Sequence, residues 1–266
     1  MQLNEQPIGV FDSGIGGLTV AKAIRQVLPY ESLLYFGDTI HLPYGDKSSQ
    51  AIQKFSKQIA RFLSEKHCKM IVIACNTASS LAYETVKEAC PELDIINVID
   101  PVINQVLKPH SVVGVIGTKA TIQSGIYAQK INQKDSSITV KSLATPLLAN
   151  LIEEGFIKDD ISQVIIQNYL RKEELKDIQQ LILACTHYPL IQSSIASYYD
   201  HQVGIIDSAS EVAKYVKQLL EQKNRLSKKN SVTDHFFISN YTESFEQSAK
   251  FFFGENMTLE EVTLNF

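Results

Sequence analysis

Short apolar segments alternate with longer amphipathic segments along most of this chain. The apolar segments are 8–11, 33–36, 70–74, 95–99, 112–116, 138–143, 181–184 and 203–206. The amphipathic segments include 18–28, 48–65, 79–89, 190–198 and 211–221. Strands that are apolar on both faces, with a helix between one strand and the next, are typical of parallel sheets covered by helices. The pattern therefore predicts an α/β fold.

Two segments of the first half recur in the second half. Ile8-Gly9-Val10-Phe11 resembles Val113-Gly114-Val115-Ile116, and the offset from Gly9 to Gly114 is 105 residues. Residues 71–77 resemble residues 181–187, and the offset from Cys75 to Cys185 is 110 residues. The similar offsets predict two pseudo-symmetric lobes, each a mostly parallel sheet, with the active site in the cleft between them.

The stretch that follows Asp207 has no counterpart within residues 98–207. It reads as a helix, a polar linker, a strand at 236–238, another helix and a last strand. We therefore expect a discontinuous first lobe of residues 1–97 plus 208–266, and a second lobe of residues 98–207.

The charge balance excludes some classes of partner. The chain has 25 Lys and Arg against 29 Asp and Glu, a net charge of -4, which does not favour binding to nucleic acid or to an anionic membrane. No apolar run is long enough to cross a membrane, and the first ten residues lack the features of a secretory signal. We expect a cytoplasmic protein.

Four cysteines are present, at 68, 75, 90 and 185, and none belongs to a Cys-x-x-Cys pair. We therefore expect free thiols and no metal site. Cys75 and Cys185 each follow a repeated strand and precede polar residues, whereas Cys68 and Cys90 read as core residues. Because ligands bind at the carboxyl ends of parallel strands, two thiols could approach one cleft from opposite sides. That arrangement suits removal of a proton from one face of a carbon and delivery to the other.

A glycine-rich turn, Asp12-Ser13-Gly14-Ile15-Gly16-Gly17, follows the first strand. It is not a dinucleotide-binding fingerprint, because Thr19 stands where the third glycine would be, and we expect no cofactor. Asp12 could orient or deprotonate a group in the cleft, or it could cap a helix. His187, two residues after Cys185, could act as a proton relay or an electrostatic partner.

Five motifs in order resemble those of the glutamate racemases. They are Asp12-Ser13-Gly14-Ile15-Gly16-Gly17, Pro43-Tyr44-Gly45, Ala74-Cys75-Asn76-Thr77-Ala78, Gly117-Thr118-Lys119-Ala120-Thr121 and Cys185-Thr186-His187-Tyr188-Pro189. The resemblance covers residues 7–215. It implies two α/β lobes related by a pseudo-twofold axis, and cofactor-independent interconversion of L- and D-glutamate that supplies D-glutamate for peptidoglycan.

The resemblance also assigns roles to residues of this chain. The implied catalytic residues are Cys75, Cys185, Asp12, His187 and Glu153. The implied substrate-binding residues are Asp12, Ser13, Tyr44, Gly45, Asn76, Thr77, Thr186 and His187. The chain departs from many relatives at Ile40, His41 and Lys47, where a small residue, an Arg and another Arg are common. A homodimer is an option that the sequence leaves open.

Three other functions are compatible with parts of this pattern. An aspartate racemase or a related two-cysteine isomerase would share the thiols, but such relatives typically have Glu where His187 stands. A two-lobed small-molecule binding protein would share the cleft, but would not need paired thiols. A redox sensor would join Cys75 and Cys185 in a disulfide, which requires Cα atoms within about 7 Å.

Overall fold

The computed structural model describes residues 3–106, 109–157, 159–229, 231–254 and 257–264. Within these residues, the strands form two parallel sheets, one of six strands and one of four. The first sheet has the order β10-β9-β2-β1-β3-β4, with β1 (Ile8–Asp12), β2 (Leu33–Gly37), β3 (Met70–Ile73), β4 (Asp94–Asn97), β9 (His235–Ile238) and β10 (Leu259–Glu261). The second has the order β6-β5-β7-β8, with β5 (Val112–Gly117), β6 (Thr139–Ala144), β7 (Gln180–Ala184) and β8 (Gly204–Asp207). The predicted α/β fold with two parallel sheets is confirmed.

The two sheets repeat the same topology. The order β2-β1-β3-β4 in one sheet corresponds to β6-β5-β7-β8 in the other. In both orders the strand that comes first in the sequence, β1 or β5, lies at an inner position. Gly9 pairs with Ile71 across β1 and β3, and Gly114 pairs with Leu181 across β5 and β7. The sequence repeat is therefore a repeat of strand order and register. The tail strand β9 pairs with β2 in the first sheet, while the division of the lobes at 97 and 207 stays a prediction.

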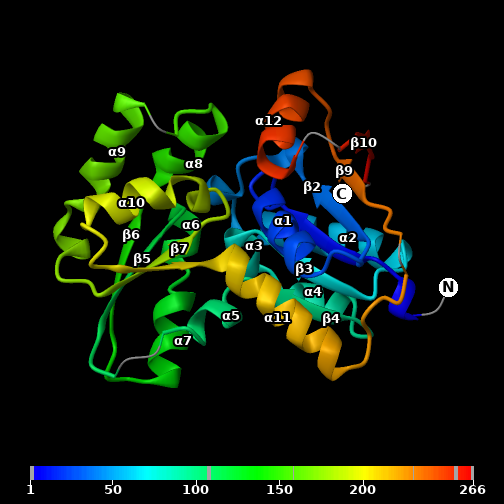
Figure 1. Cartoon of the computed structure of the whole chain (residues 1–266), viewed down its shortest axis with the longest axis horizontal. Coiled ribbons are helices and arrows are strands. Elements are labelled where there is room, and N and C mark those ends of the chain that lie inside the picture. Colours follow the sequence, from blue (N-terminus) through cyan, green and yellow to red (C-terminus); the bar gives the residue numbers. More distant parts are fainter. Residues whose placement is uncertain (1–2, 107–108, 158, 230, 255–256, 265–266) are drawn as a thin grey trace.

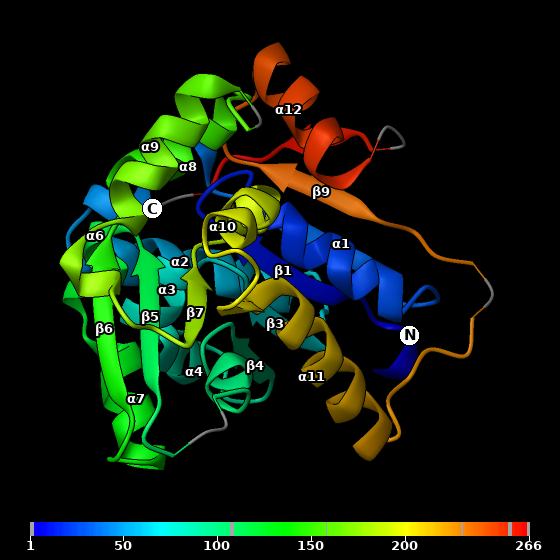
Figure 2. The ribbon, with the colours of Figure 1, turned by 60° about the vertical axis from the view of Figure 1, so that its left-hand side comes forward.

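Helices cover both faces of each sheet and separate into two lobes (Figure 1). The helices of the described residues are α1 (Leu18–Val27), α2 (Ser49–Glu65), α3 (Asn76–Leu81), α4 (Tyr83–Ala89), α5 (Asp100–Ile103), α6 (Lys119–Gln123), α7 (Ile126–Lys134), α8 (Pro146–Glu153), α9 (Asp160–Leu170), α10 (Gln192–Tyr198), α11 (Ser208–Gln222) and α12 (Glu243–Phe253). Helix α11 runs from the second lobe to the first and packs along α1 (Figures 1 and 2). None of the helices in these ranges is both long and apolar enough to cross a membrane.

One hydrophobic core extends through both lobes. Alternate side chains of β1, such as Val10, and of β7, such as Leu183, point into the same cluster, which also includes Val212 and Leu220 of α11. The opposite faces of the two sheets have separate cores, represented by Phe11 and Ile182. Since successive residues of a strand face opposite sides, this explains why the strand segments are apolar throughout.

The helix after β3 differs from the sequence prediction. We expect one helix over 79–89, but the structure has two, which meet at Ala82 with φ −126° and ψ 3°. The first of them begins at Asn76, directly after Cys75, which is its N-cap. The segment predicted as a helix over 190–198 likewise begins as a 3-10 turn (Tyr188–Ile191) before α10. Both differences put a helical turn immediately after a cysteine motif.

Candidate active site

The carboxyl ends of β1, β3, β5 and β7 surround one pocket between the lobes. Of the residues implied by the resemblance, this pocket is lined by Ser13, Tyr44, Gly45, Cys75, Asn76, Thr77, Glu153, Cys185, Thr186 and His187. Asp12 does not line it and lies directly behind, at the end of β1. The topology thus brings together side chains that are far apart in the sequence, as expected for the carboxyl edges of two parallel sheets.

Cys75 is on the first-lobe side of this pocket. Its sulfur accepts the N–H of Ala78 at 3.4 Å and lies 3.7 Å from the Ser13 hydroxyl, so the thiol is held at the start of α3. Burial and, to a smaller extent, the nearby Asp12 carboxylate raise the pKa of Cys75 to about 12, against smaller opposing effects of the hydrogen bonds from Ala78 and Ser13. Cys75 is therefore a protonated thiol at neutral pH and can donate a proton.

Cys185 is on the second-lobe side and has a different partner. The Cys185 sulfur lies 3.6 Å from Nδ1 of His187, and Nε2 of the same ring lies 2.7 Å from Glu153 Oε1. The helix α8 ends at Glu153, so this carboxylate reaches the imidazole from a separate element of the second lobe. The three groups form a chain that runs from thiol to imidazole to carboxylate.

The charge of His187 follows from these neighbours. Burial lowers the pKa of His187, but the hydrogen bonds and charges of Cys185 and Glu153 outweigh this, and the pKa lies well above its ordinary value. An imidazolium is thus favoured at neutral pH. A cation beside a cysteine stabilises the thiolate form. The two thiols of the pocket therefore have different neighbours: an imidazolium lies beside Cys185, and a buried carboxylate, Asp12, lies near the protonated Cys75.

Asp12 is fully buried and acts on the pocket from behind Cys75. One carboxylate oxygen accepts the N–H of Gly14 at 2.9 Å, and the other, Oδ1, has no hydrogen-bond partner among the described residues. Burial raises the pKa of Asp12 despite the opposing effects of His187 and of backbone hydrogen bonds. The side chain does not cap α1, whose N-cap is Gly17 without a side-chain bond. An unpaired buried oxygen is free to accept a proton or a hydrogen bond.

Neutral polar groups form part of the pocket wall. Tyr127 donates its hydroxyl proton to Asn76 Oδ1 at 2.6 Å, and this leaves Asn76 Nδ2 buried without a partner among the described residues. Thr77 lies 3.0 Å from the Thr118 hydroxyl and 3.2 Å from that of Thr121. These oriented donors can hold a carboxylate without adding a second full charge to the pocket.

Several second-lobe residues around this pocket are not among the site residues predicted from the sequence. Thr118 lines the pocket, and its offset from Ser13 is the same 105 residues that relate the first pair of strands, so the repeat contained this signal. Tyr127, Ala149 and Asn150 carry no such signal. Their positions depend on how α7 and α8 pack on the sheet, and no local sequence motif predicts this packing.

The loop before Tyr44 explains one departure from the family pattern. Buried Asp38 accepts the hydroxyl proton of Tyr44 at 2.6 Å and that of Ser239 at 3.0 Å. His41 Nδ1 lies 2.9 Å from the same carboxylate, and its ring stacks on Phe55 with centroids 3.8 Å apart. His41 thus anchors the loop, while Ile40 and Lys47 are exposed.

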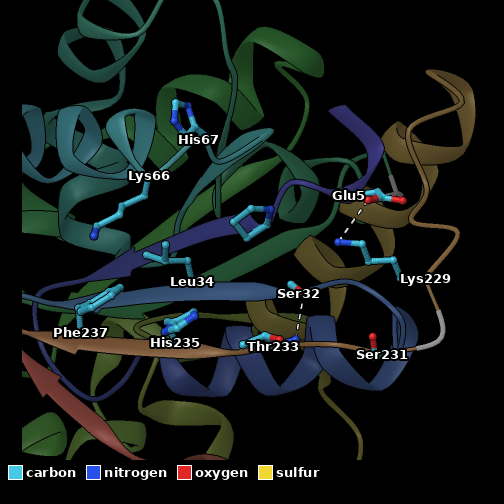
Figure 3. Close-up of a pocket in the computed structure, with 11 residues that line it drawn as sticks. Glu5, Ser32, Leu34, Lys66, His67, Lys229, Ser231, Thr233, His235 and Phe237 are labelled. Carbon is cyan, nitrogen blue, oxygen red and sulfur yellow. Dashed lines mark hydrogen bonds and ion pairs between the residues drawn. The ribbon is translucent and has the colours of Figure 1, made fainter. Parts of the chain in front are cut away.

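A larger cavity of about 460 Å³ lies at the opposite edge of the first sheet (Figure 3). It is bounded by the amino-terminal ends of β2 and β9, including Leu34 and His235, and by Lys66, His67 and Lys229. No cysteine lines it. The pocket that contains both thiols is only about 50 Å³, yet its chemistry and its position at the carboxyl edges make it the candidate active site.

Comparisons with known proteins agree with this geometry. The Asp/Glu/Hydantoin racemase family matches residues 18–216. A glutamate racemase of Chlorobaculum parvum is 39% identical over 256 residues, which cover 94% of this chain and 93% of the relative. The crystal structure of glutamate racemase from Francisella tularensis in complex with D-glutamate superposes with a TM-score of 0.93 at 40% identity, covering 98% of each chain. An aspartate racemase homologue from Pyrococcus horikoshii has a TM-score of 0.59 at 19% identity and shares the fold alone.

Proposed function

The chain belongs to the Asp/Glu/Hydantoin racemase family and, within it, to the glutamate racemases, and from this premise we propose that Cys75 and Cys185 are the two bases that exchange the α-proton of glutamate. The enzyme is an isomerase that interconverts L- and D-glutamate, and the D-enantiomer serves peptidoglycan synthesis. The observation that supports the role of the thiols is their position on opposite sides of one pocket at the carboxyl ends of equivalent strands, β3 and β7.

The different surroundings of the two thiols indicate the order of proton transfers in one turnover. The Cys185 thiolate removes the α-proton and becomes a thiol, the electron pair stays on the α-carbon, and Cys75 gives its own proton to the opposite face and becomes a thiolate. His187 and Glu153 stabilise the thiolate at Cys185 before the transfer. Asp12, whose Oδ1 has no hydrogen-bond partner among the described residues, assists on the Cys75 side. By analogy with the family, the Cys185 side acts on L-glutamate and the Cys75 side acts on D-glutamate.

The polar groups of the pocket are the substrate's partners in this proposal. Asn76 Nδ2 is buried and has no partner among the described residues, so it is available for a carboxylate of glutamate. Ser13, Thr77, Thr186 and the Tyr44-Gly45 segment supply further hydroxyl and backbone groups around the same space. These contacts would fix the α-carbon between the two sulfur atoms. Such positioning contributes a large part of the rate in two-group proton transfer.

Two further expectations concern where the enzyme acts and how it assembles. We assign the enzyme to the cytoplasm, where the family generally acts, and a homodimer stays a prediction. The chemistry described here uses only side chains of this chain and needs no cofactor to balance the proton transfer.

Replacement of one thiol at a time tests the proposal. We expect Cys75→Ala and Cys185→Ala each to lower the rate of racemisation of L-glutamate by at least about 10²-fold, because general acid–base groups contribute about 10²–10⁴-fold. The rate is measured by circular dichroism without added cofactor. Cys90→Ala is the matched control, because Cys90 is a buried thiol that does not line the pocket. A pocket variant that racemises within about tenfold of the wild type would contradict the two-thiol mechanism.

A further inference from the structure

The imidazole of His187 is held by groups from both lobes. Its two nitrogen atoms face Cys185 and Glu153, which belong to its own lobe. Gly16, in the turn after β1, approaches the ring so closely that a Cβ atom there would lie 2.5 Å from Cε1 and 2.6 Å from Nδ1. Phe252 of α12 contacts the ring with centroids 5.8 Å apart at an angle of 81°. The first lobe's turn and the C-terminal helix therefore form a slot for this ring.

The same segment is tied to the first lobe by its backbone. The hydroxyl of Thr19, in the first turn of α1, donates to the carbonyl oxygen of Thr186 at 2.9 Å. This bond fixes the peptide group that precedes His187. The Cys185-Thr186-His187 segment thus docks on α1 of the opposite lobe, and the slot does not depend on the ring contact alone.

Phe252 is itself fixed in position. It is 2% exposed, and its carbonyl oxygen accepts a hydrogen bond from Nζ of Lys22 in α1 at 3.3 Å. The next residue, Phe253, packs against Phe236 of β9 with ring centroids 4.7 Å apart. Helix α12 therefore lies along α1 above the first sheet, on the side that faces the second lobe (Figures 1 and 2).

An edge-to-face ring contact restricts what the imidazole can do. The hydrogen bond to Glu153 fixes one nitrogen but still permits the ring to tilt about that bond. A buried aromatic ring packed nearly at right angles to the imidazole restricts this freedom. Because a misplacement of about 1 Å can cost about 10²-fold in rate, the tilt of this ring matters for proton transfer at Cys185.

We propose that Phe252 is a positioning residue that holds the His187 imidazole against Cys185, so that the C-terminal helix α12 completes the active site of the second lobe. This inference rests on the proposed roles of His187 and Cys185. Phe252 itself does not touch the pocket, and it acts only through the imidazole.

Substitution of Phe252 tests the proposal. We expect Phe252→Ala to lower kcat about tenfold with a KM change below about threefold, and to increase the primary isotope effect for α-deuterated L-glutamate more than that for D-glutamate. Phe252→Leu keeps most of the volume without the aromatic edge, and we expect a loss of about threefold. Gln247→Ala is the matched control, because Gln247 is an exposed residue of the same helix, and it should leave all constants unchanged. Far-ultraviolet circular dichroism and thermal unfolding report on the fold of each variant.

The outcomes separate this inference from the proposed function. If His187→Asn slows the enzyme but folded Phe252→Ala keeps the wild-type kcat and isotope effects, Phe252 has no positioning role and the two-thiol mechanism stands. If Cys185→Ala retains activity, the proposed function itself fails. Where Phe252→Ala does not fold, Phe252→Leu decides, and wild-type constants in that variant would overturn the inference.

Discussion

At the scale of single residues, the two thiols differ most in the ionisable groups that lie near them. The buried carboxylate of Asp12 lies near Cys75, and the pKa of the Cys75 thiol is raised to about 12. Cys185 has an imidazole whose pKa is raised by Cys185 and Glu153 despite burial. One thiol therefore has a buried carboxylate near it, and the other has an imidazolium. This difference makes the resting enzyme asymmetric, although its fold is nearly symmetric.

The asymmetry predicts different effects for Asp12→Asn and His187→Asn. His187→Asn should mainly slow proton removal by Cys185, and Asp12→Asn should mainly slow proton removal by Cys75. The ratio of kcat/KM values in the two directions cannot change, because the equilibrium constant between enantiomers is one. The effect should therefore appear in kcat, in KM and in the primary isotope effects for α-deuterated L- and D-glutamate. Equal changes in both isotope effects for both variants would argue against one helper for each thiol.

Cys68 provides a prediction about stability and pH that is independent of catalysis. Burial raises the pKa of this thiol to about 12, whereas in the unfolded chain it has an ordinary value of about 8.5. A raised pKa favours the protonated form in the fold. The contribution of Cys68 to the free energy of unfolding is therefore fully present below the pKa of the unfolded chain. It is lost as the pH rises from about 9 towards 12.

We therefore expect the free energy of unfolding of the wild type to fall more steeply above pH 9 than that of Cys68→Ala, by up to about 1.4 kcal/mol per pH unit. Urea unfolding between pH 8 and pH 10, with a reductant present, measures the two slopes. The absolute stability of the variant is not the readout, because the substitution also leaves a small cavity. Parallel slopes would show that the buried thiol does not resist ionisation.

At the scale of elements, the pocket depends on hydrogen bonds that join the ends of separate strands. Asp38 follows β2, Ser239 follows β9, and both bond within one network that holds Tyr44. Glu153 at the end of α8 similarly holds His187 after β7. The strand ends bring these side chains close together, and the hydrogen bonds then orient them.

Tyr44→Phe tests the first of these networks. Loss of the hydroxyl leaves Asp38 with fewer donors and frees the ring that lines the pocket, and a hydrogen bond to a charged group contributes about 1.5–3 kcal/mol. We expect KM for glutamate to rise about tenfold with a smaller change in kcat, because the interaction is present in both ground and transition states. Tyr30→Phe, at a side chain that is 59% exposed, serves as the control in steady-state assays. An unchanged KM would show that the Asp38 network does not orient the substrate loop.

The strands and the two thiols could be predicted from the sequence for a simple physical reason. Strands buried on both faces are continuous apolar runs, and the residue after such a run lies at the carboxyl edge of a parallel sheet. These features depend only on local sequence.

The break at Ala82 could not be predicted, because alanine is a good helix former and the cause is tertiary. The hydroxyl of Ser79 donates to the carbonyl of Ile73 at 2.9 Å and accepts the N–H of Val98 at 3.2 Å, so the short helix α3 is fixed to β3 and to the residue after β4. The contact of Phe252 with His187 was missed for a similar reason. It comes from the docking of α12, and no motif marks it.

At the scale of the whole molecule, one core and one pocket join the two lobes. The shared cluster includes Val10 of β1, Leu183 of β7 and Leu220 of α11, so the sheets are held by the same apolar side chains. Hydrogen bonds such as Thr77–Thr118 and Tyr127–Asn76 link the lobes at the pocket itself. The repeated topology then places one thiol from each lobe at the same pocket.

The central claim is that each thiol serves one face only, and incorporation of deuterium from solvent tests it most directly. Pure L-glutamate is incubated with the enzyme in D₂O, and both enantiomers are analysed at low conversion by mass spectrometry after chiral separation. Because the proton that reaches the second face comes from a thiol that has exchanged with solvent, the D-glutamate formed should carry deuterium at the α-carbon while the recovered L-glutamate does not. The reverse experiment from D-glutamate should give the mirror result. Equal early labelling of substrate and product would contradict the account, since it would mean that a single base serves both faces.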